Sequence, residues 1–188
     1  VDNRDGEISS MQGFSLNTEN LANDDGKILS QQGLILRIEQ ALNNAKGLIV
    51  AQSLDGYAAR LDNEGGTLSS RSDLTLGVDG LLINRSKGLI TAGGNLTLAS
   101  NGLDNQQGTL LGTAVGIDLG SSGADLNNAA GLITTTGKLS IKHLRDLNNQ
   151  GGEISSSQNL QLGARVLDNG SGKLLSNGTL QLQAGSVI

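Results

Sequence analysis

One pattern of sixteen residues recurs nine times along the 188-residue chain, and this recurrence limits the possible folds more than any other feature. The unit reads L-x-N-x-x-G-x-[IL]-x-[small]-x-x-x-L-x-L and is followed by a short variable link. The copies start near residues 1, 21, 42, 61, 83, 103, 126, 147 and 167, so successive starts are 19 to 23 residues apart. Self-similarity at this spacing is typical of solenoids, in which each repeat packs only against its neighbours.

Each unit holds two short runs in which apolar residues alternate with polar or small ones, the period-two pattern of a β-strand. We expect strands of only about three to five residues, which cannot bury an apolar face unless successive copies stack. Stacked in parallel at ~4.8 Å per strand, nine coils would form a rod roughly 40 Å long. The sequence therefore predicts an all-β fold, a single-stranded parallel β-helix of about nine coils that occupies residues 1–188 as one segment.

The composition agrees with a thin column. The chain has 28 Gly, no Pro, no Cys, no Trp and only two aromatic residues, Phe14 and Tyr57. Aromatic side chains dominate most compact cores, so their scarcity favours repeated layers of aliphatic residues. Proline would remove a backbone donor that each coil needs for its neighbour. The stretch Leu34–Lys46 has no Gly and could be helical, but Leu34, Leu36 and Leu42 keep the register of the repeat.

Equivalent positions of the nine copies should form columns inside the solenoid. One core ladder is expected from the apolar residue after the Gly: Ile8, Ile28, Ile49, Leu68, Ile90, Leu110, Ile133, Ile154 and Leu174. A second is expected from the L-x-L motif: Leu16, Leu36, Leu76, Leu98, Leu119, Ile141, Leu162 and Leu182, with Tyr57 as its irregular member. Small residues should fill a narrow corner: Ser10, Ser30, Ala51, Ser70, Ala92, Thr135, Ser156 and Ser176.

The N-x-x-G element of each unit predicts a turn, because Asn tolerates left-handed backbone and Gly adopts positive φ without steric cost. Stacked turns would align the asparagines in a ladder: Asn3, Asn23, Asn44, Asn63, Asn105, Asn128, Asn149 and Asn169, with Asn84 displaced by one. The glycines of these turns are Gly6, Gly26, Gly47, Gly66, Gly88, Gly108, Gly131, Gly152 and Gly172.

No residue pattern indicates a cofactor, metal or catalytic site. The acids Asp24, Asp25, Asp62, Glu64 and Asp104 occupy variable turn positions, where a solvated surface is expected.

His143 is the only histidine, and with no Cys it does not suggest zinc. The pairs Gly65–Gly66, Gly93–Gly94 and Gly151–Gly152 fit turns rather than calcium repeats. Asn84, Asn95, Asn169 and Asn177 lie in N-x-[ST] sequons, which chance explains in so polar a chain. Phe14 falls on the L-x-L motif and should pack in the core, whereas the place of Tyr57 stays open.

Charge and hydropathy exclude two classes of partner. The net charge is -5, and the 13 basic residues are scattered singly, so no nucleic-acid-binding face is expected. No apolar run approaches the roughly 20 residues that span a bilayer, so membrane insertion by this segment is not expected.

The strings LDNEGG, NLTL and LDNQQG, repeated at about 20 residues over the whole chain, resemble the haemagglutinin repeats of filamentous haemagglutinin-type exoproteins. These are secreted partners of two-partner secretion systems and include adhesins and CdiA-like contact-dependent growth inhibition proteins. The resemblance implies a right-handed β-helix, export through a dedicated outer-membrane transporter, and display as a fibre on the bacterial surface. In the growth-inhibition branch such repeats carry a receptor-binding region and a C-terminal toxin, neither of which is visible in these residues.

Three functions follow as hypotheses. The first is a rigid stalk that presents a distal receptor-binding or toxin region, without enzyme activity of its own. The second is an adhesive face that binds a host or bacterial receptor, for which a cluster of exposed aromatic or like-charged residues would be needed. The third is a β-helix glycan-active enzyme, which would need carboxylates clustered on neighbouring strands.

The repeat is in phase from Val1 and breaks off at Val187–Ile188, so we expect the natural chain to continue in both directions. Open end coils expose strand edges that can pair with another chain. The segment should therefore be monomeric or associate weakly end to end.

Overall fold

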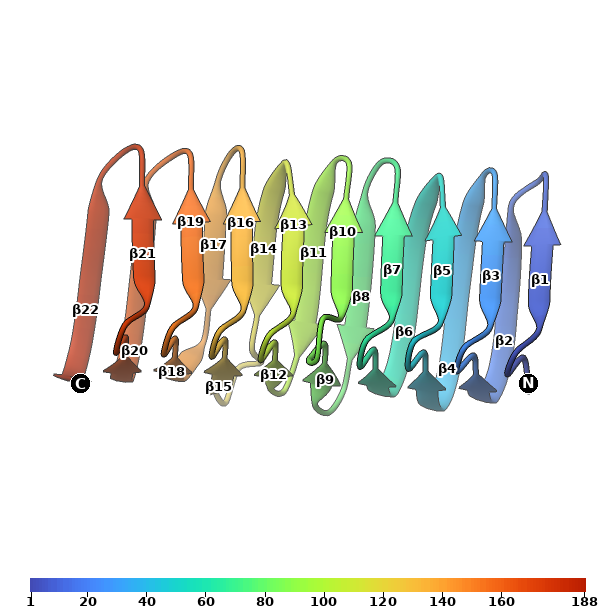
Figure 1. Ribbon diagram of the computed structural model, residues 1–188, viewed down its shortest axis with the longest axis horizontal. Helices are drawn as coiled ribbons and strands as arrows, with labels where there is room; N and C mark the ends of the chain where they lie inside the picture. The colour runs from blue at the N-terminus through green and yellow to red at the C-terminus, as the bar shows by residue number, and fades with distance from the viewer.

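The computed structural model describes residues 1–188 and consists of β-strands joined by turns, without any helix. All strand pairs are parallel, and the chain winds as a column of stacked coils (Figure 1). In Figure 1 the chain ascends through the front strands, crosses the upper edge, descends at the back and advances from right to left, which is a right-handed path. The prediction of a parallel β-helix with about 20 residues per coil is confirmed.

The front sheet contains one short strand from each coil, in coil order. Its strands are β1 (Glu7–Ser10), β3 (Lys27–Ser30), β5 (Leu48–Ala51), β7 (Thr67–Ser70), β10 (Leu89–Ala92), β13 (Thr109–Gly112), β16 (Leu132–Thr135), β19 (Glu153–Ser156) and β21 (Lys173–Ser176). Ile8 pairs with Ile28, and Ile28 with Ile49, so equivalent aliphatic residues lie over one another.

The second sheet forms the back of the column and the lower edge in Figure 1. Its strands are β2 (Phe14–Ala22), β4 (Gly33–Asn43), β6 (Ser53–Asp62), β8 (Leu74–Val78), β9 (Leu82–Ile83), β11 (Asn95–Ser100), β12 (Leu103–Asp104), β14 (Ala114–Asp118), β15 (Ala124–Asn127), β17 (Leu139–Lys142), β18 (Leu144–Asn148), β20 (Leu160–Asp168) and β22 (Leu180–Val187). Five of these strands have eight or more residues, because the L-x-L strand continues through the link into the next unit. The stretch Leu34–Lys46 is largely strand β4, not a helix.

The second core ladder differs from the expected one at two coils. Gly56, not Tyr57, pairs with Leu36 and Leu76, and the side chain of Tyr57 lies outside, 40% exposed. Ile117, not Leu119, pairs with Leu98 and Ile141. Side chains alternate between the inside and the outside along a strand, and Tyr57 is one residue away from the inward position. The adjacent Gly56 therefore lies inside, and the ring of Tyr57 is exposed to solvent. Leu119 is buried nevertheless, two residues beyond the column.

Two further columns complete the core. The first Leu of the L-x-L motif pairs from coil to coil, and Phe14 belongs to this column as the partner of Leu34. The Leu that opens each unit forms another column, as in the pair Leu21 and Leu42. The large aliphatic members in the middle coils are buried in one continuous hydrophobic cluster, except Ile141, which is partly buried and packs against it. At a typical ~25 cal/mol per Å² of apolar surface removed from water, such layers are the main stabilising contribution.

From Ser30 to Ser156 the small corner residues are buried, and those with a hydroxyl group also act as hydrogen-bond donors. The hydroxyl of Ser70 donates to the carbonyls of Gln52 and Asp73, at 3.0 and 2.8 Å. Thr135 donates to Thr113 at 2.6 Å. A hydroxyl therefore fits this corner for a second reason besides size, because it satisfies carbonyl groups that turn away from the sheet.

The back sheet is interrupted between the seventh and eighth coils. Strand β17 pairs with β14 on one side and with no strand on the other, so it ends the order of the sheet. The amide of Val115 donates to Lys138 O at 3.0 Å and that of Leu160 to Thr179 O at 2.9 Å, whereas the corresponding bond from Leu139 to Asn159 is missing. The front strands β16 and β19 stay paired across the same boundary, so the column is open on one side only.

Candidate functional site: the asparagine ladder and the outer faces

The turn asparagines form one continuous buried ladder. Asn23 Nδ2 donates to Asn44 Oδ1 at 2.7 Å, Asn44 Nδ2 donates to Asn63 Oδ1 at 2.7 Å, and the chain of amides continues to Asn169. Each amide also donates to a backbone carbonyl of its own turn, as Asn63 does to Gly66 O at 3.1 Å. An amide is the side chain that suits this position, because it donates to one neighbour and accepts from the other.

Asn84 is a full member of the ladder. It accepts from Asn63 at 2.7 Å and donates to Asn105 at 2.8 Å, and it is fully buried. The extra residue of its turn is absorbed by two successive residues with positive φ, Ser86 and Lys87. The expected displacement therefore affects the turn and not the ladder. Burial also withdraws the Asn84 amide, one of the four sequon positions, from solvent.

The role expected for the turn glycines is wrong in one respect. The positive φ falls on the residue before the Gly, for example Asp25, Lys46 and Gln107, and not on the Gly itself. The Gly is needed because the coils approach closely: a Cβ on Gly66 would lie 2.0 Å from Asn44 O. No side chain fits at that distance, so contact between coils, and not left-handed backbone, dictates the Gly.

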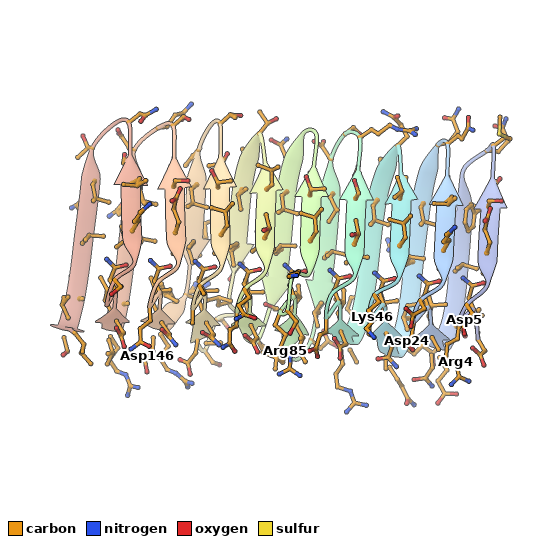
Figure 2. The ribbon with its side chains drawn as sticks, viewed as in Figure 1. Arg4, Asp5, Asp24, Lys46, Arg85 and Asp146 are labelled. Atoms are coloured by element: carbon orange, nitrogen blue, oxygen red, sulfur yellow. The ribbon has the colours of Figure 1, made fainter.

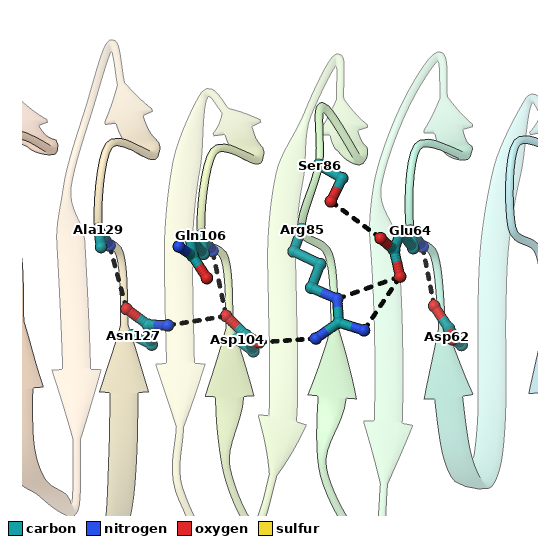
Figure 3. A network of polar contacts seen from close by, with 8 residues as sticks. All are labelled: Asp62, Glu64, Arg85, Ser86, Asp104, Gln106, Asn127 and Ala129. Atoms are coloured by element: carbon teal, nitrogen blue, oxygen red, sulfur yellow. Dashed lines mark hydrogen bonds and ion pairs between the residues drawn. The ribbon is translucent and has the colours of Figure 1, made fainter.

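The acids of the turns stabilise the turns and link the coils. Asp62 Oδ1 accepts from the amide of Glu64 at 2.9 Å, and Asp104 Oδ1 accepts from the amide of Gln106 at 3.2 Å (Figure 3). Arg85 joins two of these turns, since it bonds Glu64 and faces Asp104 Oδ2 at 4.0 Å (Figure 3). Hydrogen bonds from Ser86 and Arg85 lower the pKa of Glu64 below its usual value.

Ion pairs continue this pattern along the rod. Arg37 pairs with Asp55 at 2.6 Å and Arg145 with Asp125 at 2.7 Å, in each case across a coil boundary. The hydrogen bond from Arg145 lowers the pKa of Asp125. Figure 2 shows charged residues such as Arg4, Asp24 and Arg85 gathered along the lower edge of the rod, where the turns lie. All these groups are largely exposed, so each pair contributes little on its own.

No group of three or more His, Asp or Glu side chains is placed to hold a metal ion. His143 is exposed, has a positive φ and lies with Nδ1 2.7 Å from Asp118 Oδ1. That hydrogen bond lowers the pKa of Asp118. The hydroxyl of Tyr57 donates to Asp79, on the same face. The structure contains no helix that is long and apolar enough to span a bilayer.

A hollow of about 490 Å³ lies over the interruption of the back sheet. It is lined by Lys138 and Lys142 on one side and by Asn159 and Gln161 on the other. The sequence gives no signal for this feature, because the repeat pattern keeps its register on both sides of it.

The fold and its buried ladder define the chain as a solenoid in which every coil repeats the same set of contacts. A model of the haemagglutinin repeat matches residues 1–46, 36–100, 80–143 and 144–188. The chain therefore belongs to the haemagglutinin repeat family, whose repeats are structural and adhesin-like and are typical of secreted surface proteins. No curated protein and no solved structure matches it. The resemblance to filamentous haemagglutinin-type repeat regions is thus confirmed at the level of the family, and the architecture fits a segment of an extended filament.

Proposed function

We propose that this chain is a rigid stalk segment of a secreted bacterial cell-surface exoprotein, with a length set by the number of its coils. The observation that carries the proposal is the front sheet, in which nine strands, one from each coil, follow each other without a break. Each added coil extends such a sheet by ~4.8 Å and buries the open end of the one before. The product is a stiff spacer between whatever lies at its two ends.

The proposal extends to export and cargo. The protein would leave the cell through an outer-membrane two-partner secretion transporter, and the stalk would hold a receptor-binding region or a growth-inhibition toxin away from the surface. Two features support this. A chain with no Cys can cross a pore unfolded without disulfide exchange. Contacts confined to adjacent coils let folding propagate coil by coil as the chain emerges.

Duplicating whole coils tests the stalk function. Residues 21–102 span four coils, from Leu21 to the residue before Leu103, so a second copy inserted after Gly102 keeps the register. We expect the maximum dimension measured by small-angle X-ray scattering to rise by ~19 Å at constant cross-section. A Gly/Ser insertion of equal length is the control and should broaden the profile as a flexible chain. An unchanged dimension, or a thicker particle, would refute the stalk.

A second experiment separates the stalk from the adhesive face. In the full exoprotein, the duplicated coils should increase the distance of the distal region from the membrane while receptor binding stays with that region. If binding instead persists after the distal region is removed and is lost when the outward side chains of these coils are replaced, the segment itself is the adhesin.

A further inference from the structure

The outward side chains of the front sheet form two columns. The first outer column holds the first residue of each front strand, paired from coil to coil. In coil order it reads Glu7, Lys27, Leu48, Thr67, Leu89, Thr109, Leu132, Glu153 and Lys173. Charges therefore occur only at the two ends, and the five middle coils present Leu and Thr alternately.

The order of the charges is the informative feature. Both ends read Glu then Lys. A second copy placed face to face in the same direction would have its strands reversed, so Glu7 and Lys27 would face the uncharged second outward position of its strands and would have no charged partner. A copy placed in the opposite direction sets Glu7 against Lys173 and Lys27 against Glu153. The middle of the column then matches itself, with Leu48 against Leu132, Thr67 against Thr109 and Leu89 on the twofold axis. Opposite charges across the contact are favourable and like charges are costly.

The rest of the face does not oppose this arrangement. The second outer column is uncharged: Ser9, Leu29, Val50, Ser69, Thr91, Leu111, Thr134, Ser155 and Leu175. Leu111 is 38% exposed and Leu175 46% exposed, so apolar surface is left to bury. Nine strands of four residues cover an area of about 550 Å² per copy, or roughly 1,100 Å² for a pair. That is near the lower limit of a specific interface, and a weak dimer is expected.

We propose that the front face binds a second copy of this chain in antiparallel orientation, around a twofold axis that runs along the strands through Leu89. On stalks of the kind proposed above, such a contact would join fibres that point in opposite directions, as those of two facing cells do. That consequence rests on the proposed function, whereas the contact between two copies does not.

Charge-exchange variants test the contact at constant composition and net charge. Exchanging one end, Glu7→Lys with Lys27→Glu, sets a lysine against the partner's lysine and a glutamate against the partner's glutamate in the antiparallel pair. Within each chain a Lys still neighbours a Glu, so folding should be unaffected. We expect sedimentation equilibrium to show a dimer dissociation constant at least about tenfold higher than that of the unmodified chain. Exchanging the other end as well, Glu153→Lys with Lys173→Glu, should restore the original affinity.

The matched control exchanges an ion pair on the back sheet, Asp125→Arg with Arg145→Asp, and should leave dimerisation unchanged. Circular dichroism of every variant checks the fold. A chain that stays monomeric up to millimolar concentration would overturn the proposal. So would a dimer that all variants keep with equal affinity, which would indicate end-to-end association of open coils. An elongated but monomeric particle would leave the stalk function standing, so the two failures can be told apart.

Discussion

From the second turn on, a carbonyl oxygen of the preceding coil lies where the turn Gly would carry a side chain. This contact and the asparagine ladder occupy the same few ångströms: a Cβ on Gly66 would meet Asn44 O at 2.0 Å and Asn63 Oδ1 at 2.7 Å. The Gly thus sets the distance between coils, and the hydrogen bonds between the asparagine side chains depend on that distance. Its neighbour Gly65 has a different role, since it has a φ of 64° and a Cβ there would make only ordinary van der Waals contacts, with Lys46 Cγ and Ser86 O at 3.5 Å.

This difference predicts that substitution by Ala is tolerated at Gly65 but not at the adjacent Gly66. Gly66→Ala should lower the free energy of unfolding by about 3 kcal/mol or more, because a backbone oxygen cannot move out of the way. Gly65→Ala should cost only about 1 kcal/mol, the strain of a left-handed Ala. Lys46 and Asp25 already hold that conformation at equivalent turns. Urea denaturation measures both values, and equal losses would contradict the packing role of Gly66.

The ladder makes a second prediction at one residue. Asn63→Asp keeps the shape of the side chain and can accept from Asn44, but an ionised carboxylate has no hydrogen to donate to Asn84 Oδ1. We expect a loss of about 3 kcal/mol in unfolding free energy at neutral pH. Asn17→Asp is the control, because Asn17 is exposed on strand β2 and lies outside the ladder. A similar loss in both variants would show that the hydrogen bonds of the ladder do not contribute specifically to the free energy of unfolding.

Spacing of residue types predicts which residues stack but not why each one is required. The recurrence of Asn and Gly predicts stacked turns, and the structure aligns the asparagines. Gly is the usual residue for a positive φ, so the pattern suggests that role, whereas a close approach between coils cannot be recognised from one unit. Asn84 shows the same limit, since only the three-dimensional turn reveals that Ser86 and Lys87 absorb the extra residue.

At the scale of strands, β17 and β20 do not pair although the repeat pattern treats them as neighbours, and only β15, β18 and β20 connect the back sheet across these coils. The link of the seventh coil turns at His143, which has a positive φ, and the chain then enters β18. Strands β17 and β20 consequently lie side by side without pairing. The differences from the expected ladder at Tyr57 and Leu119 have another cause, since the corner between the front and back strands is one residue shorter in both coils. Leu34 pairs with Leu54 although Ile28 pairs with Ile49, and Leu96 pairs with Val115 although Ile90 pairs with Leu110.

Missing backbone bonds should be visible as fast amide exchange. The amide of Leu139 lacks the partner that Val115 and Leu160 have in the neighbouring coils. We expect its protection factor in native-state hydrogen exchange, measured by NMR, to be at least about tenfold lower than those of the other two amides. Equal protection of the three would mean that the back sheet is continuous in solution.

The ion pairs between strands predict that the free energy of unfolding decreases slightly at acidic pH. The pKa of Asp125 is lowered, chiefly by its hydrogen bond from Arg145, so the pair stabilises the fold above the ordinary Asp pKa and loses that effect as the pH falls below it. Arg145→Gln should lower the free energy of unfolding only slightly at pH 7, because both partners of the ion pair are exposed to solvent. The difference from the unmodified chain should vanish near pH 2. Lys138→Gln, which removes a cation outside the ion pairs, should show no such change with pH.

At the scale of the whole molecule, stability should be a sum over coils and over the contacts between adjacent coils. The front sheet, the core columns and the ladder cross every boundary, so most boundaries are nearly equivalent. The boundary between the seventh and eighth coils is the exception, since β17 and β20 do not pair there and only β15 and β18 of the back sheet do. That boundary should contribute less than the ones on either side.

Stepwise truncation measures these contributions. Chains 1–166, 1–146 and 1–125 remove the ninth, eighth and seventh coils in turn. Each step should lower the free energy of unfolding, and the step from 1–166 to 1–146 should be the smallest, because it removes the incompletely paired boundary. Urea denaturation followed by circular dichroism, fitted globally for the four lengths, gives the increments. A middle step as large as the other two would show that the front sheet and the ladder alone determine the coupling between coils, and that the missing back-sheet bonds carry little weight in solution.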